Sequence, residues 1–259
     1  MNILALSDTH GSLPKIDTPF DLLLICGDVC PVYCHATKFQ REWVNDEFNK
    51  WISSLPFKDD NSVVVMTPGN HDFVFEGKEP YWTVIKDFEL ANNPRIKVLY
   101  NETYEHTYLD DNGVAHTLSI YGTPACKVFG NWAFMYGPDT LKDMYNKCPE
   151  GVDIIISHDA PTINALGFIH EGRWSGKDAG NPLLDDLMNR VKPKYYFCGH
   201  IHSGQHTMTE HNGTMTANVS YVDEQYHDHP DSILHMVIDD ATKALVTCNK
   251  LPQEPIGKA

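Results

Sequence analysis

The chain has 259 residues, which is enough for one large α/β domain with a substantial core. Its content of 42% hydrophobic and 11% aromatic residues excludes a largely disordered protein. The formal net charge of −15 argues against a long nucleic-acid partner, because basic side chains that neutralise phosphates drive most of such binding.

The first part of the chain alternates predicted strands and helices. Apolar runs predict short strands at residues 2–7 and 21–26. Aromatic and aliphatic residues at helical spacing predict an amphipathic helix at 37–55. A β-branched run at 62–67 predicts a strand that is buried on both faces, and a further strand is expected at 96–100.

The middle of the chain is less regular. Asn112-Gly113 is a strong turn signal and predicts a hairpin. A strand at 117–121 follows, and then a loop at 129–134 that is rich in aromatic residues. The remaining elements expected here are helices at 139–146 and 183–191 and strands at 153–157 and 195–198.

The end of the chain changes to antiparallel hairpins around two turns, Asn212-Gly213 and Asp239-Asp240. The strands expected on either side are 207–209 and 214–219 for the first hairpin, and 233–238 and 244–247 for the second. No linker, repeat or low-complexity segment is visible, so we expect residues 1–259 to form a single domain.

Cysteine usage and the start of the chain indicate a cytoplasmic protein. Seven cysteines, an odd number, give no disulfide framework. The spacing of Cys26, Cys30 and Cys34 could suggest a thiolate metal site, but a structural zinc site needs a second pair of ligands. We expect no signal peptide, because the first strand starts almost at Met1, and no apolar run is long enough to span a membrane.

Five short polar motifs carry the chemical information, and nearly all of them follow a predicted strand. Carboxylate, amide and imidazole side chains without clustered cysteines suit two divalent ions bound for hydrolysis, not a structural zinc. Such a site supplies its own positive charge to a small phosphorylated substrate. The motif residues are Asp8, His10, Asp28, Asn70, His71, His158, His200 and His202.

The ordered set D-x-H, G-D, G-N-H-D, H and G-H-x-H resembles the calcineurin-like metallophosphoesterase superfamily over residues 8–202. Each motif alone is weak, but all five in this order are a strong signal. The resemblance implies two divalent ions (Mn, Fe, Zn, Ni or Co, with Mn favoured). The implied ligands are Asp8, His10 and His202 for the first ion, Asn70, His158 and His200 for the second, and Asp28 as a bridge between them.

The resemblance also implies a mechanism and a fold. A hydroxide that bridges the metals is expected to attack phosphorus, with His71 as the general acid and Asp72 orienting its imidazole. The fold class is α/β, a four-layer α/β/β/α sandwich of two mixed sheets with the site along the strand ends. We expect the C-terminal hairpins at 205–250 to complete the second sheet.

A narrower resemblance is to the small metallophosphoesterase-domain proteins that hydrolyse cyclic nucleotides. It rests on residues 192–204, on 122–124 with Asn131-Trp132, and on 218–221. It makes a phosphodiesterase for cyclic nucleotides or other small diesters the first expectation. The segment 27–32, which begins with Gly27-Asp28, carries no arginine, and this disfavours a protein phosphatase within the alternative class of phosphomonoesterases. A non-catalytic scaffold is disfavoured because the ligand set is complete.

Side chains around the motifs are the candidates for substrate contact. Aromatic rings could stack on a base, and Arg173 could meet a phosphate or stay solvated. Surface or hairpin positions are expected for most histidines outside the motifs, and none of these histidines, His35 included, is expected to bind a metal. The substrate-binding candidates are Asn131, Trp132, Arg173, Trp174, His206 and Tyr221, with Phe129 as a further aromatic candidate. The sequence does not indicate an oligomeric state.

Overall fold

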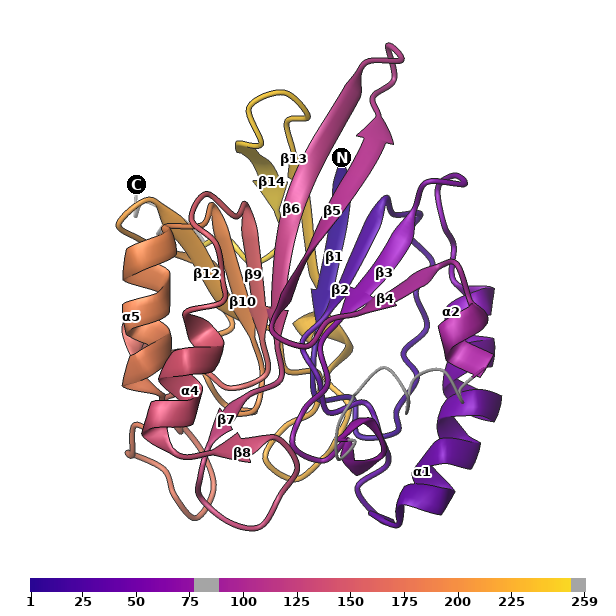
Figure 1. Ribbon diagram of the computed structural model, residues 1–259. Coiled ribbons are helices and arrows are strands. Elements are labelled where there is room, and N and C mark those ends of the chain that lie inside the picture. The colour runs from indigo at the N-terminus through magenta and orange to yellow at the C-terminus, as the bar shows by residue number, and fades with distance from the viewer. Residues whose placement is uncertain (77–88, 253–259) are drawn as a thin grey trace, which may run out of the picture.

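The structure is a computed structural model that describes residues 1–76 and 89–252. Two six-stranded sheets lie face to face, and helices cover the outer face of each sheet (Figure 1). The layers therefore run α/β/β/α, and the predicted fold class is confirmed. The single-domain assignment for 1–259 stays a prediction.

The first sheet has the strand order β14-β13-β1-β2-β3-β4. The strands from β1 to β4 are parallel, whereas β13 and β14 add antiparallel to the other edge of β1. Its strands are β1 (Asn2–Leu6), β2 (Leu22–Ile25), β3 (Val63–Met66), β4 (Ile96–Val98), β13 (Leu234–Ile238) and β14 (Leu245–Cys248).

The second sheet has the strand order β11-β12-β10-β9-β6-β5. Its four central strands are parallel and its two edge strands are antiparallel. The strands are β5 (Glu102–Leu109), β6 (Ala115–Thr123), β9 (Ile154–Ser157), β10 (Tyr195–Cys198), β11 (Thr209–His211) and β12 (Thr214–Asn218). A separate short pair consists of β7 (Cys126–Lys127) and β8 (Met135–Tyr136).

The two C-terminal hairpins join different sheets. The hairpin β11–β12 completes the second sheet as predicted, but β13–β14 joins the first, so the prediction for 205–250 is wrong in this part. The reason lies in the pattern of β13, where Leu234, Met236 and Ile238 are buried in alternation. Pairing with β1 directs these three side chains into the core between the sheets.

The helices cover the outer faces of the sheets. The expected helix at 37–55 forms as three consecutive segments, with a π-helical segment between two α-helices. Trp43, Phe48 and Ile52 from these segments pack against the first sheet. The helices are α1 (Thr37–Trp43), η1 (Val44–Phe48), α2 (Asn49–Ser54), α4 (Pro138–Tyr145) and α5 (Pro182–Val191). Short 3-10 segments are η2 (Phe73–Phe75), η3 (Glu89–Asn92), η4 (Ile163–Ala165) and η5 (Pro230–Ser232).

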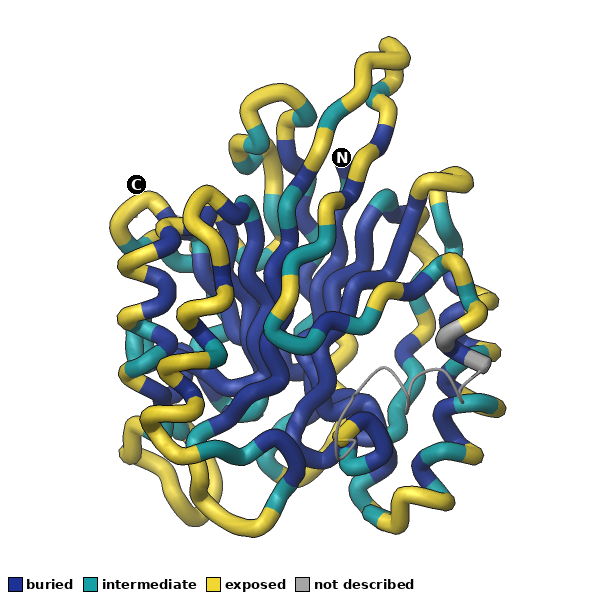
Figure 2. The backbone as a smooth tube through the Cα atoms, viewed as in Figure 1, coloured by how far each residue is buried: buried dark blue, intermediate teal, exposed yellow. Residues whose placement is uncertain are grey.

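Alternation along the strands divides the core into three layers. In β2, Leu22 and Leu24 face the layer between the sheets, whereas Leu23 and Ile25 face α1 and α2. A third layer lies between the second sheet and helices α4 and α5. Both sheets are therefore buried along most of their length, as the dark tube in the centre of Figure 2 shows. Each fully buried aliphatic side chain contributes about 1.5–3 kcal/mol through removal from water.

The two sheets come together at one end of their parallel strands. Ser7, directly after β1, forms a parallel bridge with Ser220, which lies two residues beyond β12. The Ser7 amide donates to the Val219 carbonyl at 2.8 Å, and the Tyr221 amide donates to the Ser7 carbonyl at 2.8 Å. The carboxyl ends of strands from both sheets therefore share one edge, and this edge carries the polar motifs.

Candidate metal centre

The predicted ligands lie in loops that directly follow parallel strands of both sheets. Asp8, His10, Asp28 and His200 have φ values of 50°, 46°, 51° and 67°. This left-handed backbone is uncommon outside glycine and costs on the order of 1–3 kcal/mol per residue. Four residues in this strained conformation at one sheet edge are typical of a functional site.

Two motif glycines allow the loops to approach one another. A Cβ atom on Gly69 would overlap the Asp28 carboxylate, and a Cβ atom on Gly199 would overlap the side chains of Ser7 and Asp8. Each glycine comes from one motif and makes room for another. The glycines in G-N-H-D and G-H-x-H are therefore explained by close packing between loops.

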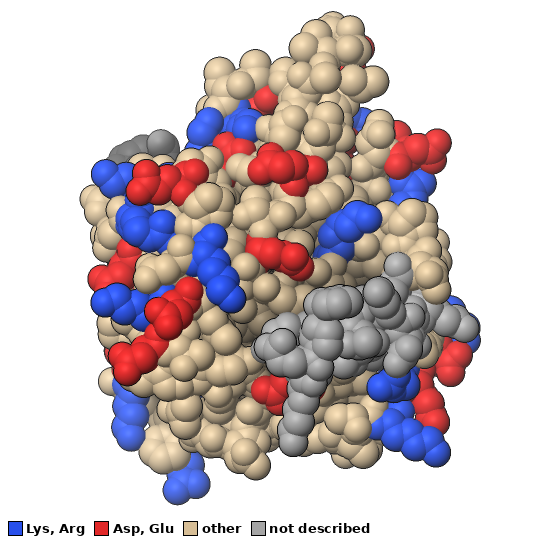
Figure 3. Space-filling model, in the orientation of Figure 1, with Lys and Arg blue, Asp and Glu red and all other residues tan. Residues whose placement is uncertain are grey.

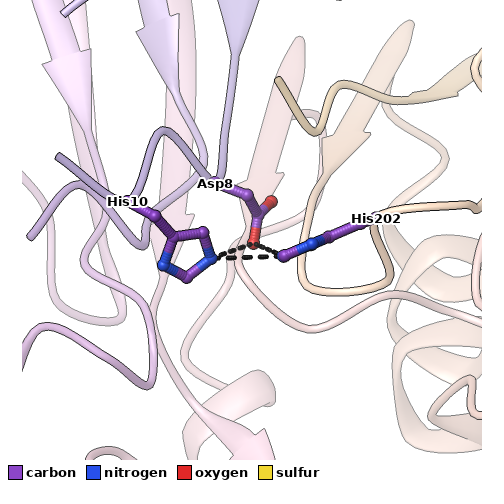
Figure 4. A group of neighbouring side chains, drawn as sticks. All are labelled: Asp8, His10 and His202. Atoms are coloured by element: carbon purple, nitrogen blue, oxygen red, sulfur yellow. Dashed lines mark hydrogen bonds and ion pairs between the residues drawn. The ribbon is translucent and has the colours of Figure 1, made fainter. Parts of the chain in front are cut away.

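The first cluster consists of Asp8, His10 and His202 (Figure 4). The Nε2 atoms of His10 and His202 lie 3.2 Å apart. Asp8 Oδ1 lies 3.9 Å from His10 Nε2 and 3.5 Å from His202 Nε2. Three potential ligand atoms from the ends of β1 and β10 thus converge on one point, as the sequence predicted for the first ion.

The second cluster lies beside the first and consists of Asp8, Asp28 and His158. His158 Nε2 lies 3.3 Å from Asp28 Oδ2 and 2.8 Å from Asn70 Oδ1. Asp28 Oδ2 is also 3.8 Å from His10 Nε2, so this carboxylate lies between the two clusters. The ring centroid of His200 is 5.1 Å from that of His158, but His200 belongs to neither three-residue cluster.

Hydrogen bonds to the outer atoms of the predicted ligands hold them in place. The Nδ1–H groups of His158 and His202 donate to the carbonyl oxygens of Cys26 and Asp223, both at 2.9 Å. This arrangement leaves Nε2 of each neutral ring as a lone-pair donor aimed into the clusters. Ser220 Oγ donates to Asp8 Oδ2 at 2.8 Å and orients the carboxylate.

These residues fit a pair of divalent ions. Asp8 and Asp28 are almost fully buried, and no lysine or arginine pairs with either of them in the ranges 1–76 and 89–252. Buried carboxylates need a cation to offset the loss of hydration. In the same ranges, Nδ1 of His10 and Nδ2 of Asn70 are buried without a hydrogen-bond partner. Hydrogen bonds within the protein therefore do not satisfy all the polar atoms of the predicted ligands. Oxygen and imidazole ligands of this kind suit a first-row transition metal.

The electrostatics of the metal-free centre depend on His158. Burial alone would lower the pKa of its imidazole, but the charges of Asp28 and Asp8 raise it to about 10. Burial lowers the pKa of His10 to about 4, and burial together with the charge of His158 lowers the pKa of His200 to about 4. The proton on His158 therefore partly offsets two buried carboxylates that a metal ion would neutralise fully.

A cavity of about 570 Å³ opens onto the centre and brings together several of the predicted substrate residues. Trp132 and Trp174 line it, and Phe129 is a third aromatic wall residue. Asn131 is exposed beside this wall, and Arg173 lies with its guanidinium 5.0 Å from the Trp174 ring centroid. Neither Asn131 nor Arg173 is among the described residues that line the cavity.

Tyr221 and His206 lie behind the centre and do not line this cavity. The ring nitrogens of His206 lie 3.1 and 2.9 Å from the carbonyl oxygens of Asn218 and His202. Asn218 Nδ2 in turn donates to the carbonyls of Gly199 and Ile201 at 3.2 and 2.8 Å. The segment at 218–221, of which only Tyr221 was predicted to contact substrate, braces the G-H-x-H loop.

The structure gives Asp72 a different role from the predicted one. Its carboxylate accepts hydrogen bonds from the amides of Cys30 and Gly69, both at 2.8 Å. Burial and the charge of Asp28 raise its pKa to about 6. The partner of the His71 ring is instead His35, whose Nε2 lies 3.1 Å from His71 Nδ1. The prediction that Asp72 orients the imidazole is therefore wrong. His35, which was not among the predicted site residues, lines the cavity.

Tyr226 is a site residue that sequence reasoning did not identify. Its ring centroid lies 4.9 Å from that of His10 and 5.3 Å from that of His202, in edge-to-face contacts. It belongs to a non-repetitive loop after β12 and carries no motif that could have pointed to it. The loop places an aromatic wall over the first cluster.

Comparison with known proteins identifies the class to which this arrangement belongs. A family model for calcineurin-like phosphoesterases matches residues 1–204. The chain therefore belongs to the calcineurin-like phosphoesterase family, and its buried Asp and His clusters form a candidate metal site. Members of this family typically bind two divalent metal ions.

Individual relatives agree with this assignment. Metallophosphoesterase domain-containing protein 1 of Homo sapiens and of Mus musculus is 30% identical over 230 residues, or 82% of this chain. The chain spans 63% of the length of these two relatives. A UPF0046 protein of Caenorhabditis elegans is 28% identical over 249 residues, which cover 90% of this chain and 80% of that protein. The resemblance to metallophosphoesterase-domain proteins is thus confirmed.

Two solved structures share the fold at low sequence identity. TT1561 of Thermus thermophilus has a TM-score of 0.53 at 13% identity and covers 95% of this chain and 96% of its own. The phosphopantetheinyl hydrolase of Mycobacterium tuberculosis has a TM-score of 0.51 at 12% identity and covers 87% and 90%. At these identities the likeness concerns the fold alone. Within the described ranges, none of the helices combines the length and hydrophobicity needed to cross a bilayer.

Proposed function

We propose that this protein hydrolyses small phosphodiesters, cyclic nucleotides among them, at a centre that holds two divalent ions, with Mn favoured. The observation that carries the proposal is the cavity beside the clusters. Phe129, Trp132, Ile169, Trp174 and Tyr226 give it apolar walls within reach of the predicted ligands. A diester carries two organic groups on one phosphate, so one of them can rest on such walls while phosphorus faces the centre.

The positive charge available in the cavity also favours a diester. No arginine is among the described residues that line it. Lys127 Nζ donates to the Gly180 carbonyl at 2.5 Å, and Lys177 Nζ lies 4.3 Å from the Trp174 ring centroid. Both ammonium groups are therefore engaged with the protein. A diester has one negative charge to neutralise, whereas a monoester has close to two.

The residues of the chain divide the work of the reaction among them. Asp8, Asp28 and the imidazoles around them would hold the ions, whose chemistry is Lewis acidity and charge neutralisation at phosphorus. His71 lines the cavity between this centre and Trp132 and is placed to protonate the leaving oxygen. As the water oxygen bonds to phosphorus, the water releases one proton to solvent and the bond to the leaving oxygen breaks with its electron pair. That oxygen takes the His71 proton, and His71 is protonated again from solvent.

Stacking would hold a substrate that carries a base. The rings of Phe129 and Trp174 are each 52% exposed and reach into the cavity from two different loops. Stacking of a base on an aromatic side chain is worth about 1–3 kcal/mol. This contribution would separate nucleotides from diesters of similar charge that lack a ring.

A phosphomonoesterase is the alternative, and the two lysines of the cavity support it. If Lys127 and Lys177 released their present partners, their ammonium groups could neutralise the second charge of a monoester. Hydrolysis of a monoester therefore requires a rearrangement of the two lysine side chains, whereas hydrolysis of a diester does not. Protein phosphatase activity is less well supported, because the described residues of the cavity offer no arginine to clamp a phosphate.

The test is an assay of the Mn²⁺-reconstituted protein on four kinds of ester. They are p-nitrophenyl phosphate, bis(p-nitrophenyl) phosphate, 2′,3′-cyclic nucleotides and 3′,5′-cyclic nucleotides. We expect higher kcat/KM for at least one diester than for the monoester. Monoester turnover far above that of every diester would overturn the proposal in favour of the alternative.

A further inference from the structure

We propose that His35 is a positioning residue that fixes the proton distribution on the His71 ring. This inference rests on the proposed function, because it concerns the residue expected to protonate the leaving group. The observation behind it is the 3.1 Å distance between His35 Nε2 and His71 Nδ1, across 36 residues of sequence. Asp72, the neighbour in sequence, is held by two backbone amides and is not available for this contact.

The His71 ring is held on several sides. Trp132 is tilted by 30° against it with centroids 4.3 Å apart, and His10 meets it edge to face at 4.8 Å. Its backbone is fixed as well, because its amide donates to Asp28 Oδ1 and its carbonyl accepts from Gln40 Nε2, both at 2.7 Å. The ring therefore has little freedom to turn and exchange its two nitrogens.

The contact with His35 assigns different tasks to these two nitrogens. Nδ1 is bonded to His35, whereas Nε2 has no hydrogen-bond partner in the ranges 1–76 and 89–252. Since His71 lines the cavity, Nε2 is the nitrogen left to exchange a proton with substrate. Nδ1 must then keep its hydrogen throughout turnover. The Nδ1–H group donates a hydrogen bond to the lone pair of His35 Nε2.

His35 is itself supported in a way that suits this role. It lies in the loop between β2 and α1 and is half-buried. Its ring meets Trp132 edge to face at 5.3 Å and 89°, and its centroid is 5.5 Å from that of Phe73. A neutral imidazole holds a ring without adding a negative charge next to an anionic phosphate, which a carboxylate would do. The aromatic wall and His35 thus fix the geometry of His71 together.

Proton transfer to the leaving group makes the inference measurable. Phenol leaves as a stronger base than p-nitrophenol, so its departure depends more on a correctly placed proton. We would compare methyl phenyl phosphate with methyl p-nitrophenyl phosphate, and phenyl phosphate with p-nitrophenyl phosphate in case monoesters are the substrates. For His35→Ala we expect kcat to fall about 10–100-fold with the phenyl ester and about threefold or less with the p-nitrophenyl ester, at unchanged KM.

Two further variants separate positioning from general damage. In His35→Gln the amide oxygen can accept from His71 Nδ1, so most of the lost kcat with phenyl esters should return. In a His71→Ala background, His35→Ala should cause no further loss. Tyr33→Ala, two residues away in the same loop and 76% exposed, should behave as wild type. Equal losses for both leaving groups, or an additional loss without His71, would overturn the inference.

A measurement on the resting protein makes the result independent of the substrate. Nitrogen-15 NMR of histidine rings distinguishes Nδ1–H from Nε2–H. We expect neutral His71 to be Nδ1–H in wild type, to populate Nε2–H in His35→Ala, and to return to Nδ1–H in His35→Gln. An unchanged Nδ1–H population in His35→Ala refutes the role of His35, whatever ester the enzyme prefers. Conversely, inactivity of the wild type towards all diesters refutes the proposed function and leaves this test intact.

Discussion

The metal centre and the wall of the cavity beside it are built in opposite ways. The centre consists of side chains such as Asp8 and His158, both 0% exposed, in loops directly after parallel strands. The wall consists of residues such as Phe129 and Trp174, each 52% exposed, from loops in which neither residue directly follows a strand of the two large sheets. The centre is therefore specified by the sheets, whereas the wall depends on loops that can vary without disturbing them.

This difference separates chemistry from specificity. The two sheets meet at the Ser7–Ser220 bridge, and the predicted ligands from both of them converge there. A change in the centre should affect every substrate equally, whereas a change in the wall should affect substrates according to their organic groups. Figure 3 shows acidic and basic side chains interspersed on the face that it draws. We place specificity in the aromatic residues of the cavity wall. The following experiments test that separation.

The largest effect is expected from Asp28→Ala. The Asp28 carboxylate lies between the two clusters, 3.3 Å from His158 and 3.8 Å from His10. Its loss should weaken binding of both ions, and Lewis acids of this kind are worth several kcal/mol of barrier lowering. We expect kcat/KM to fall by on the order of 10³-fold or more for every ester tested.

A matched control for this variant is Asp17→Asn, since Asp17 is an exposed acidic residue outside the site. It should keep wild-type activity. If Asp28→Ala retained substantial activity towards one class of ester and not another, the centre would not be shared by all substrates. The separation between centre and wall would then be refuted.

Removal of the metal should destabilise the protein. Chelation would leave Asp8 and Asp28 buried, with counter-charge only from imidazoles whose pKa they raise, His158 and His202. A ligand at 1,000 times its Kd stabilises a fold by about 4 kcal/mol, which for a domain of this size is roughly 8 °C or more in Tm. We expect Mn²⁺ to raise Tm by this order in scanning calorimetry.

The wall should not contribute to that stabilisation. Trp174→Ala should therefore show the same Mn²⁺-induced increase in Tm as wild type, whereas Asp28→Ala should lose most of it. An increase in Tm that Trp174→Ala abolished would mean that the wall and the centre form one structural unit.

The pH dependence of metal binding sharpens the account of the centre itself. In the metal-free protein the pKa of His158 is raised to about 10, so this ring is protonated at pH 7–8. A metal ion needs the neutral ring, so binding releases about one proton, and affinity should rise about tenfold per pH unit until the pH approaches that pKa. Calorimetric titration at pH 7.5 in two buffers with different ionisation enthalpies measures this proton directly. Binding without proton release would contradict the assigned role of His158.

The secondary structure could be predicted best where strands are buried and least where position depends on contacts between distant segments. Runs such as 62–67 and 195–198 predicted strands within one or two residues of β3 and β10, because buried parallel strands are continuous apolar segments. The sheet that β13 joins could not be predicted, since its alternating pattern fits either sheet. The π-helical segment within the helix at 37–55 left no mark in the apolar spacing.

In the site, the structure brings together residues that a short motif places after a strand. The D-x-H and G-H-x-H motifs contain the whole first cluster. The contact of His35 with His71 was not predicted, and Asp72 was expected in its place because adjacency in sequence was taken for contact in space. In the turn that holds His71 and Asp72 the two side chains point to different neighbours, and His35 comes from another loop. No local pattern encodes a contact across 36 residues.

The smallest effect is expected for the exposed part of the wall. Trp174 is 52% exposed, so Trp174→Ala should remove part of the stacking of a base, near the lower end of about 1–3 kcal/mol. We expect KM for a cyclic nucleotide to rise about fivefold at unchanged kcat. The KM for methyl p-nitrophenyl phosphate should not change, because this ester is expected to bind with its methyl group against the wall. Trp174→Phe keeps a flat ring and should restore most of the nucleotide affinity. If Trp174→Ala lowered kcat for both esters equally, Trp174 would contribute to catalysis and not to specificity. Trp174 would then belong to the metal centre and not to the wall.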